Sequence, residues 1–214
     1  MRKSISIVFT IILMLGVLPG FSQEVKKVTL EDVWKNYTFS ARSVRGLSSM
    51  NDGIHYTTLE RTKDGQSIVK YSYQTGEAVD TVLVVRNIEG VKIDMIESYE
   101  FSADESQVLL MTNSEPIYRR SFTANYYIYN RGNNQAKSLS ENGKQQLATY
   151  SPNGRKIAFI RNNNLFYVDL ATAKEVQFTF DGEFNKIING APDWVYEEEF
   201  EFNQAFEWSA DSRK

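Results

Sequence analysis

The chain has 214 residues, no cysteine, a single histidine and a formal net charge of −3. Without cysteine it can form no disulfide, and without Cys clusters or a pair of histidines it offers no site for a transition metal, so we predict neither a metal nor a cofactor. The slightly acidic charge balance argues against nucleic acid as a partner.

The first residues have the pattern of a secretory signal peptide. Two basic residues precede a largely apolar run over 5–19, which is shorter than the roughly 20 residues that a membrane-spanning helix needs. Small residues on both sides of Phe21 fit a cleavage site after Ser22. We therefore predict a signal peptide over 1–22 and an exported bacterial protein, located in the periplasm, at the cell surface or outside the cell. An uncleaved N-terminal anchor is the alternative.

The next segment, 23–44, is expected to carry one short helix. The run from Thr29 to Trp34 begins with a threonine that is followed three residues later by an acid, Asp32, which is a variant of the capping box. Leu30, Val33 and Trp34 then follow at helical spacing.

From residue 45 onward the pattern changes to short strands separated by turns. The runs 54–59, 67–73 and 81–85 are rich in β-branched and aromatic residues, and Asp64-Gly65 and Thr75-Gly76 lie between them. After residue 155 the expected strands are 156–161, 165–170 and 175–179, with residues 162–164 as a hairpin turn. We predict a single all-β domain over 45–214.

An internal repeat organises this domain. The pattern is an aromatic residue, serine, a small residue, an acid or amide and a turn, followed by an apolar strand. It recurs at intervals of about 50 residues, as in propeller blades. The four units begin at Ser48, Phe101, Tyr150 and Trp208, and the first is the weakest because it lacks the aromatic residue. The repeated Ser and Asp or Asn are expected to serve turns and backbone hydrogen bonds.

These units predict three blades of a β-propeller and the start of a fourth. A propeller closes on itself to hide its edge strands, and the smallest common rings have four complete blades. We therefore expect this chain to be the leading part of a longer propeller.

Two segments of this domain carry charges that suggest a binding site. The first is Tyr118-Arg119-Arg120-Ser121-Phe122-Thr123-Ala124. Two arginines beside aromatic residues are usually a solvated strand end or a packing guanidinium. The second is Asp193-Trp194-Val195-Tyr196-Glu197-Glu198-Glu199-Phe200, three adjacent carboxylates behind an aromatic cluster.

Such an acidic run is usually a solvated surface element. Because like charges repel, it otherwise needs a positive partner, and adjacent glutamates converge on one cation only where the chain turns. The upstream residues 189–192, with Gly190 and Pro192, favour such a turn.

The string DWVYEEEF resembles the double-glutamate motif of the dipeptidyl peptidase IV family, serine exopeptidases that release Xaa-Pro or Xaa-Ala dipeptides from peptide N-termini. The segments TLEDVW with YTF, and YRRSFTA, also resemble that family. The resemblance covers nearly all of the chain after the predicted signal peptide. It departs at Glu201, an extra acid where the family tends to be apolar or small, which affects the expected pocket for the substrate's first side chain.

The resemblance implies roles for three residues. Glu198 and Glu199 correspond to the glutamates that hold the substrate's α-ammonium, and Arg119 to the arginine that contacts a substrate carbonyl oxygen. A guanidinium can bridge a carboxylate and a carbonyl, and its charge lowers the cost of holding two ionised glutamates together. If the amine is fixed in this way, only the peptide bond at a set distance from it can reach a nucleophile. Arg120 is expected to be structural.

The family's Ser-Asp-His triad lies on a C-terminal α/β-hydrolase domain with a Gly-x-Ser-x-Gly elbow. No such elbow occurs here, and His55 is expected to be a packed or surface residue, so we predict no catalytic residue in this chain. We expect the amine-recognition part of an exported dipeptidyl peptidase, inactive alone. Its expected partners are peptides and its own hydrolase domain, and a second copy of itself in a homodimer is a further candidate. The alternatives are a non-enzymatic propeller that scaffolds protein contacts and, less favoured because of the intact triplet, a peptidase that releases tripeptides.

Overall fold

The computed structural model of the chain describes residues 27–41, 46–63 and 65–214. The predicted signal peptide lies outside the described residues. The contacts divide the chain into two compact units, with the boundary between Ser43 and Val44. No helix among the described residues is long and apolar enough to cross a membrane.

The first unit contains the helix α2, Leu30–Trp34. It begins at the N-cap Thr29, whose side chain accepts a hydrogen bond from the backbone N–H of Asp32, while the Asp32 carboxylate accepts one from the Thr29 N–H. This reciprocal pair is the predicted capping box, and it satisfies two backbone donors that a helix start leaves without partners.

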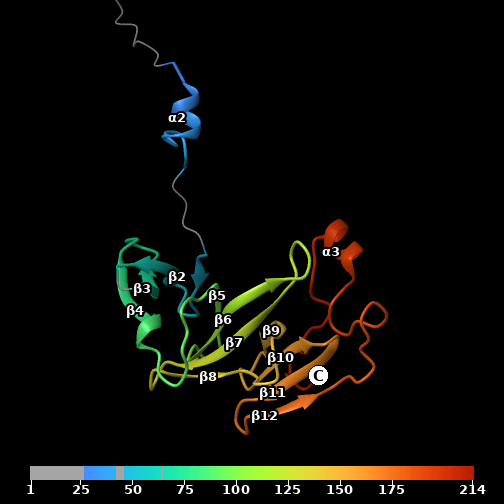
Figure 1. Cartoon of the computed structure of the whole chain (residues 1–214). Coiled ribbons are helices and arrows are strands. Elements are labelled where there is room, and N and C mark those ends of the chain that lie inside the picture. Colours follow the sequence, from blue (N-terminus) through green and yellow to red (C-terminus); the bar gives the residue numbers. More distant parts are fainter. Residues whose placement is uncertain (1–26, 42–45, 64) are drawn as a thin grey trace, which may run out of the picture. The chain divides into compact units, whose positions relative to one another are not determined.

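The second unit consists of β-propeller blades. The described residues form three four-stranded antiparallel sheets, and each sheet follows the chain order of its strands (Figure 1). We call β1–β4 blade 1, β5–β8 blade 2 and β9–β12 blade 3. The strands are β1 Ser48–Ser49, β2 His55–Thr62, β3 Gly65–Ser72, β4 Ala78–Val84, β5 Ser98–Phe101, β6 Gln107–Pro116, β7 Phe122–Asn130, β8 Gln135–Ser138, β9 Gln146–Tyr150, β10 Lys156–Arg161, β11 Asn164–Asp169 and β12 Lys174–Gln177, with a 3-10 turn, η1, at Val85–Asn87.

Two apolar cores lie between the blades. One joins blade 1 to blade 2 through residues such as Ile68 and Leu110, and the other joins blade 2 to blade 3 through residues such as Leu109 and Phe159. The Phe159 ring stacks on Phe166, with 5.5 Å between the centroids. Alternate residues of β6 therefore serve different cores, because successive side chains of a strand point to opposite faces.

The predicted turn motif is built from hydrogen bonds between its own residues. In the second unit the Ser102 hydroxyl donates to Asp104 at 2.7 Å and accepts from the Gln107 backbone N–H at 3.0 Å. Ser151 with Asn153, and Ser209 with Asp211, repeat this arrangement. The repeated Ser and Asp or Asn thus serve turns, as expected from the sequence.

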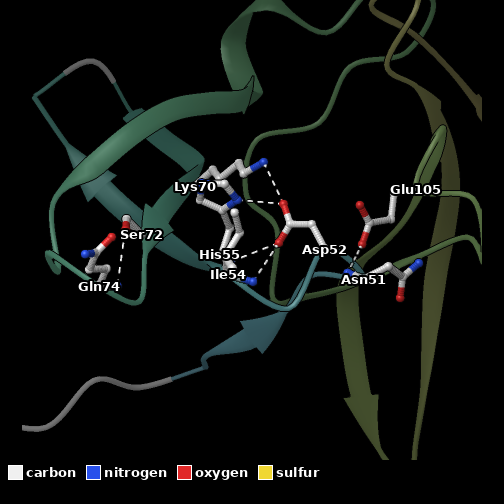
Figure 2. A network of polar contacts seen from close by, with 8 residues as sticks. All are labelled: Asn51, Asp52, Ile54, His55, Lys70, Ser72, Gln74 and Glu105. Carbon is white, nitrogen blue, oxygen red and sulfur yellow. Dashed lines mark hydrogen bonds and ion pairs between the residues drawn. The ribbon is translucent and has the colours of Figure 1, made fainter.

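The first unit of the repeat is built differently, which agrees with its weaker sequence pattern. Here the Asp52 carboxylate accepts from the backbone N–H groups of Ile54 and His55, contacts the His55 ring nitrogen Nδ1 at 2.6 Å and accepts from the Lys70 ammonium at 3.3 Å (Figure 2). Asn51 reaches the next turn, with its backbone N–H on Glu105 and its side chain on the Ala103 carbonyl. His55, the first residue of β2, is partly buried and supports this turn through Asp52.

One hairpin prediction was wrong by a residue. Asn164 belongs to β11 and pairs with Arg161, so the turn consists of Asn162 and Asn163 alone. Both have positive φ, of 49° and 61°, the conformation that two-residue hairpin turns require and that asparagine tolerates. The last strand also ends earlier than expected, at Gln177.

Candidate functional site

The acidic triplet lies in a short helix, α3, which spans Trp194–Phe200. The helix begins at the N-cap Asp193, whose carboxylate accepts hydrogen bonds from the N–H groups of Val195 at 3.0 Å and Tyr196 at 3.2 Å. It ends at Glu201, which adopts the left-handed conformation with φ of 60°. Because adjacent helical residues point about 100° apart, the three carboxylates face in different directions.

Glu197 faces inward and is only 2% exposed. Its carboxylate oxygen Oε1 accepts hydrogen bonds from the backbone N–H groups of Arg120 at 2.5 Å and Ser121 at 3.0 Å. Burial opposes ionisation of this side chain, but the polar groups of Ser121 and Arg120 outweigh it, so the pKa of Glu197 lies below its usual value. The residue is therefore a buried, ionised carboxylate that binds the backbone of a distant turn.

Glu198 pairs with Arg119. The distance from the carboxylate oxygen Oε2 to the guanidinium nitrogen is 3.3 Å, and the Glu198 side chain is 16% exposed whereas that of Arg119 is 72% exposed. The structure thus brings together two of the three predicted site residues, which are far apart in the sequence. The open guanidinium keeps donors available for a further acceptor.

Glu199 is exposed and makes no ion pair with a described residue. It follows Glu198 on the same helical turn. Its carboxylate is therefore available to a cation from solvent.

The two arginines are carried on the turn of a long hairpin. The strands β6 and β7 continue past the rest of blade 2, and the turn between them lies beside α3 (Figure 1). The hairpin bends at a register shift after Thr112, where Asn113 has a positive φ of 52°. Lys144 supports this bend, because its ammonium donates to the Asn113 carbonyl at 2.5 Å and pairs with Glu115 at 2.8 Å.

Arg120 is held by the residues that follow helix α3. Its guanidinium pairs with Glu201 at 2.9 Å, and its backbone carbonyl accepts a hydrogen bond from the Asn203 side chain at 2.9 Å. The extra acid noted at Glu201 is therefore the residue that ends α3 and holds this arginine.

Several residues of the site were not predicted from the sequence. Asp193 is followed by three apolar or aromatic residues and then by acids. This is a helix-start pattern, from which α3 could have been predicted. The roles of Glu197 and Asn203 had no such signal, because both bind backbone groups that are more than 70 residues away in the sequence. Within the described part of the chain, no group of three or more His, Cys, Asp or Glu residues is arranged to hold a metal ion.

A family model and several known proteins match this chain in sequence. The family model described as "Dipeptidyl peptidase IV (DPP IV) N-terminal region" matches residues 102–214. Human prolyl endopeptidase FAP is 34% identical over 175 residues, which cover 81% of this chain and 22% of that protein. Probable dipeptidyl-aminopeptidase B of Arthroderma benhamiae is 33% identical over 222 residues, covering 91% of this chain and 23% of the relative.

A solved structure shows the same fold. The crystal structure of Porphyromonas gingivalis dipeptidyl peptidase 4 is 43% identical, with a TM-score of 0.76, and the match covers 87% of this chain and 26% of that one. The chain thus spans about a quarter or less of the length of these proteins.

Proposed function

Because this chain belongs to the dipeptidyl peptidase IV family, as part of its N-terminal region, we propose that it recognises the free amino terminus of peptide substrates. In this proposal Glu198 and Glu199 bind the substrate's α-ammonium, and Arg119 binds the first carbonyl oxygen. The protein as a whole is an exported serine dipeptidyl peptidase that releases Xaa-Pro and Xaa-Ala dipeptides. The nucleophile comes from a hydrolase domain outside these 214 residues, so the chain alone is inactive.

The observation that carries this proposal is the pair between Arg119 and Glu198, at 3.3 Å. An exposed ion pair contributes only about 0–1 kcal/mol to stability, so holding this arginine in place does little for the fold. The pair does place a cationic donor beside the Glu198 carboxylate, and Glu199 is the next residue of the same helix. A donor and carboxylates of this kind suit the ammonium and carbonyl at the start of a peptide.

In this proposal the substrate's amine must be free, for a chemical reason. A protonated amine beside two carboxylates gains charge-assisted hydrogen bonds, whereas an acylated amine has no charge and fewer donors. Anchoring the amine fixes the position of the peptide bond that follows the second residue. Binding of the amine therefore determines which bond is cleaved.

The test uses the native protein and a Gly-Pro chromogenic substrate. We expect Glu198→Ala, Glu199→Ala and Arg119→Ala each to lower kcat/KM by about one to two decades, because losing a charge-assisted contact costs about 1.5–3 kcal/mol. Glu141→Ala is a matched control, since Glu141 is exposed and its side chain makes no hydrogen bond or ion pair with a described residue.

A second readout separates substrate binding from folding. The parent protein should discriminate strongly against a substrate with an acetylated amine, and the Glu198 and Glu199 variants should lose much of this discrimination while their thermal stability stays close to the parent's. Unchanged kinetics in all three variants would overturn the proposed site. Inactivity of the native protein towards any dipeptide substrate would instead favour a binding propeller.

A further inference from the structure

Helix α3 and the residues after it hold the turn between β6 and β7 through four contacts. Glu198 binds the Arg119 side chain, Glu201 binds the Arg120 side chain, and Asn203 binds the Arg120 carbonyl. The fourth contact is that of Glu197 with the backbone of the turn. These contacts form the clasp, defined here as the contacts of Glu197, Glu198, Glu201 and Asn203 with residues 119–121.

The members of the clasp differ in burial. The ion pairs are open to solvent on at least one side, with Arg119 72% and Glu201 71% exposed, and such pairs hold a geometry weakly. Glu197 is 2% exposed, and its partners are main-chain groups. A buried carboxylate that accepts from two backbone N–H groups is costly to displace, because all of these groups would lose partners that water cannot easily replace.

The position of these N–H groups makes the contact relevant to the site. They belong to Arg120 and Ser121, the two residues that directly follow Arg119. The turn is closed on itself by the hydrogen bond from the Ile117 N–H to the Ser121 carbonyl, at 2.8 Å. Fixing Ser121 and Arg120 therefore fixes the backbone from which the Arg119 side chain extends.

We propose that Glu197 is a positioning residue, which sets the place of Arg119 relative to Glu198 and Glu199 by clamping the backbone of the Arg120–Ser121 turn to α3. Glu197 does not touch the substrate. This inference rests on the proposed function of the other two glutamates and Arg119, and it gives the first glutamate of the triplet a separate role.

The experiment is a double-mutant cycle in the native protein, with kcat/KM on the Gly-Pro substrate as the readout. We expect Glu197→Ala to lower kcat/KM by about tenfold or more, since small misplacements of a positioning group are costly. In an Arg119→Ala background the same substitution should cost less than about threefold, because the group that it misplaces is already gone. Glu197→Gln keeps an acceptor oxygen and should stay within about threefold of the parent.

A second measurement follows the clamp itself. Amide hydrogen exchange at Arg120 and Ser121 should be faster in Glu197→Ala than in the parent, and close to the parent in Glu197→Gln. If Glu197→Ala does not fold, Glu197→Asp replaces it in both measurements. Its side chain is one methylene shorter, which moves the carboxylate away from the two N–H groups. Glu141→Ala again serves as the control.

The outcomes separate the two proposals. If Arg119→Ala and Glu198→Ala lower activity but Glu197→Ala lowers it by the same factor with and without Arg119, Glu197 is a general structural residue and the positioning role is wrong. Parent-like activity of Glu197→Ala would also overturn it. If Arg119→Ala alone leaves kcat/KM unchanged, the proposed function of the site fails, and the positioning role fails with it.

Discussion

Three adjacent glutamates have three different environments in this protein. Glu197 is buried against a backbone turn, Glu198 is mostly buried beside a guanidinium, and Glu199 is open to solvent. The helix explains the difference, because each residue is rotated by about 100° from the one before it. An acidic triplet can therefore bury one carboxylate and leave two others available for binding without bringing all three charges together.

A second carboxylate with a distinct environment is Asp52, in the first turn of blade 1 (Figure 2). Its contact with the His55 ring is the main cause that holds the pKa of Asp52 well below its usual range, with further help from the backbone N–H of Ile54 and from Lys70. Because folding lowers this pKa, the stabilisation is complete above the usual aspartate value of about 4 and is lost as the pH falls through the lower, folded value.

We therefore expect Asp52→Asn to lower the thermal midpoint at pH 6 and the difference from the parent to narrow as the pH falls below about 4. Thermal unfolding between pH 3 and 7 measures this. Asp94→Asn is the control, since Asp94 is exposed and its side chain makes no hydrogen bond or ion pair with a described residue. A difference that is constant across this pH range would show that the charge of Asp52 is not what stabilises the turn.

At the level of single residues, the sequence could nominate Arg119, Glu198 and Glu199 only through their resemblance to a family motif. From its spacing alone, the acidic run would be predicted to be a solvated surface element. The role of Glu197 could not be predicted, because its partners are backbone N–H groups and every residue except proline has one. A contact of this kind requires no particular residue type in the partner segment, so the sequence contains no sign of it.

The secondary-structure elements were more predictable than the contacts between them. Strands of the repeat were placed to within a few residues because β-branched runs and turn residues mark them locally. The boundary at Asn164 was wrong because three consecutive asparagines fit a turn equally well, and only the pairing with Arg161 shows which one is in the strand. For helix α3 the sequence predicted only a turn upstream, at 189–192, although the N-cap residue Asp193 is visible in the sequence.

That N-cap supports a prediction for the helix. The Asp193 carboxylate satisfies two N–H groups at the start of a helix of only seven residues. Asp193→Ala should destabilise α3 by about 0.5–2 kcal/mol, and because a short helix has little stability of its own, both hydrogen exchange in the helix and KM for a free-amine substrate should rise. Asp193→Asn should behave like the parent, since asparagine caps as well as aspartate. Equal effects of both substitutions would mean that the charge, and not the cap, matters here.

At the scale of the whole second unit, blade 2 holds the described blades together. Along β6, Val108 and Leu110 belong to the core shared with blade 1, whereas Leu109 belongs to the core shared with blade 3. All three are at most 3% exposed. The strand that carries these residues also continues into the hairpin with Arg119, so packing between blades supports the position of the site.

Because of this alternation, we expect substitutions of two neighbouring residues to affect the cores on opposite faces of blade 2. Leu109→Ala and Leu110→Ala should each lower the free energy of unfolding by about 2–5 kcal/mol, because each leaves a cavity in a packed core. Hydrogen exchange of the native protein should rise in blade 3 for Leu109→Ala and in blade 1 for Leu110→Ala, while β6 loosens in both. Leu47→Ala is a suitable control, since that leucine is 44% exposed. If both core variants gave the same exchange pattern in all three blades, the blades would open as one unit, and the two cores would not be separable as their residues suggest.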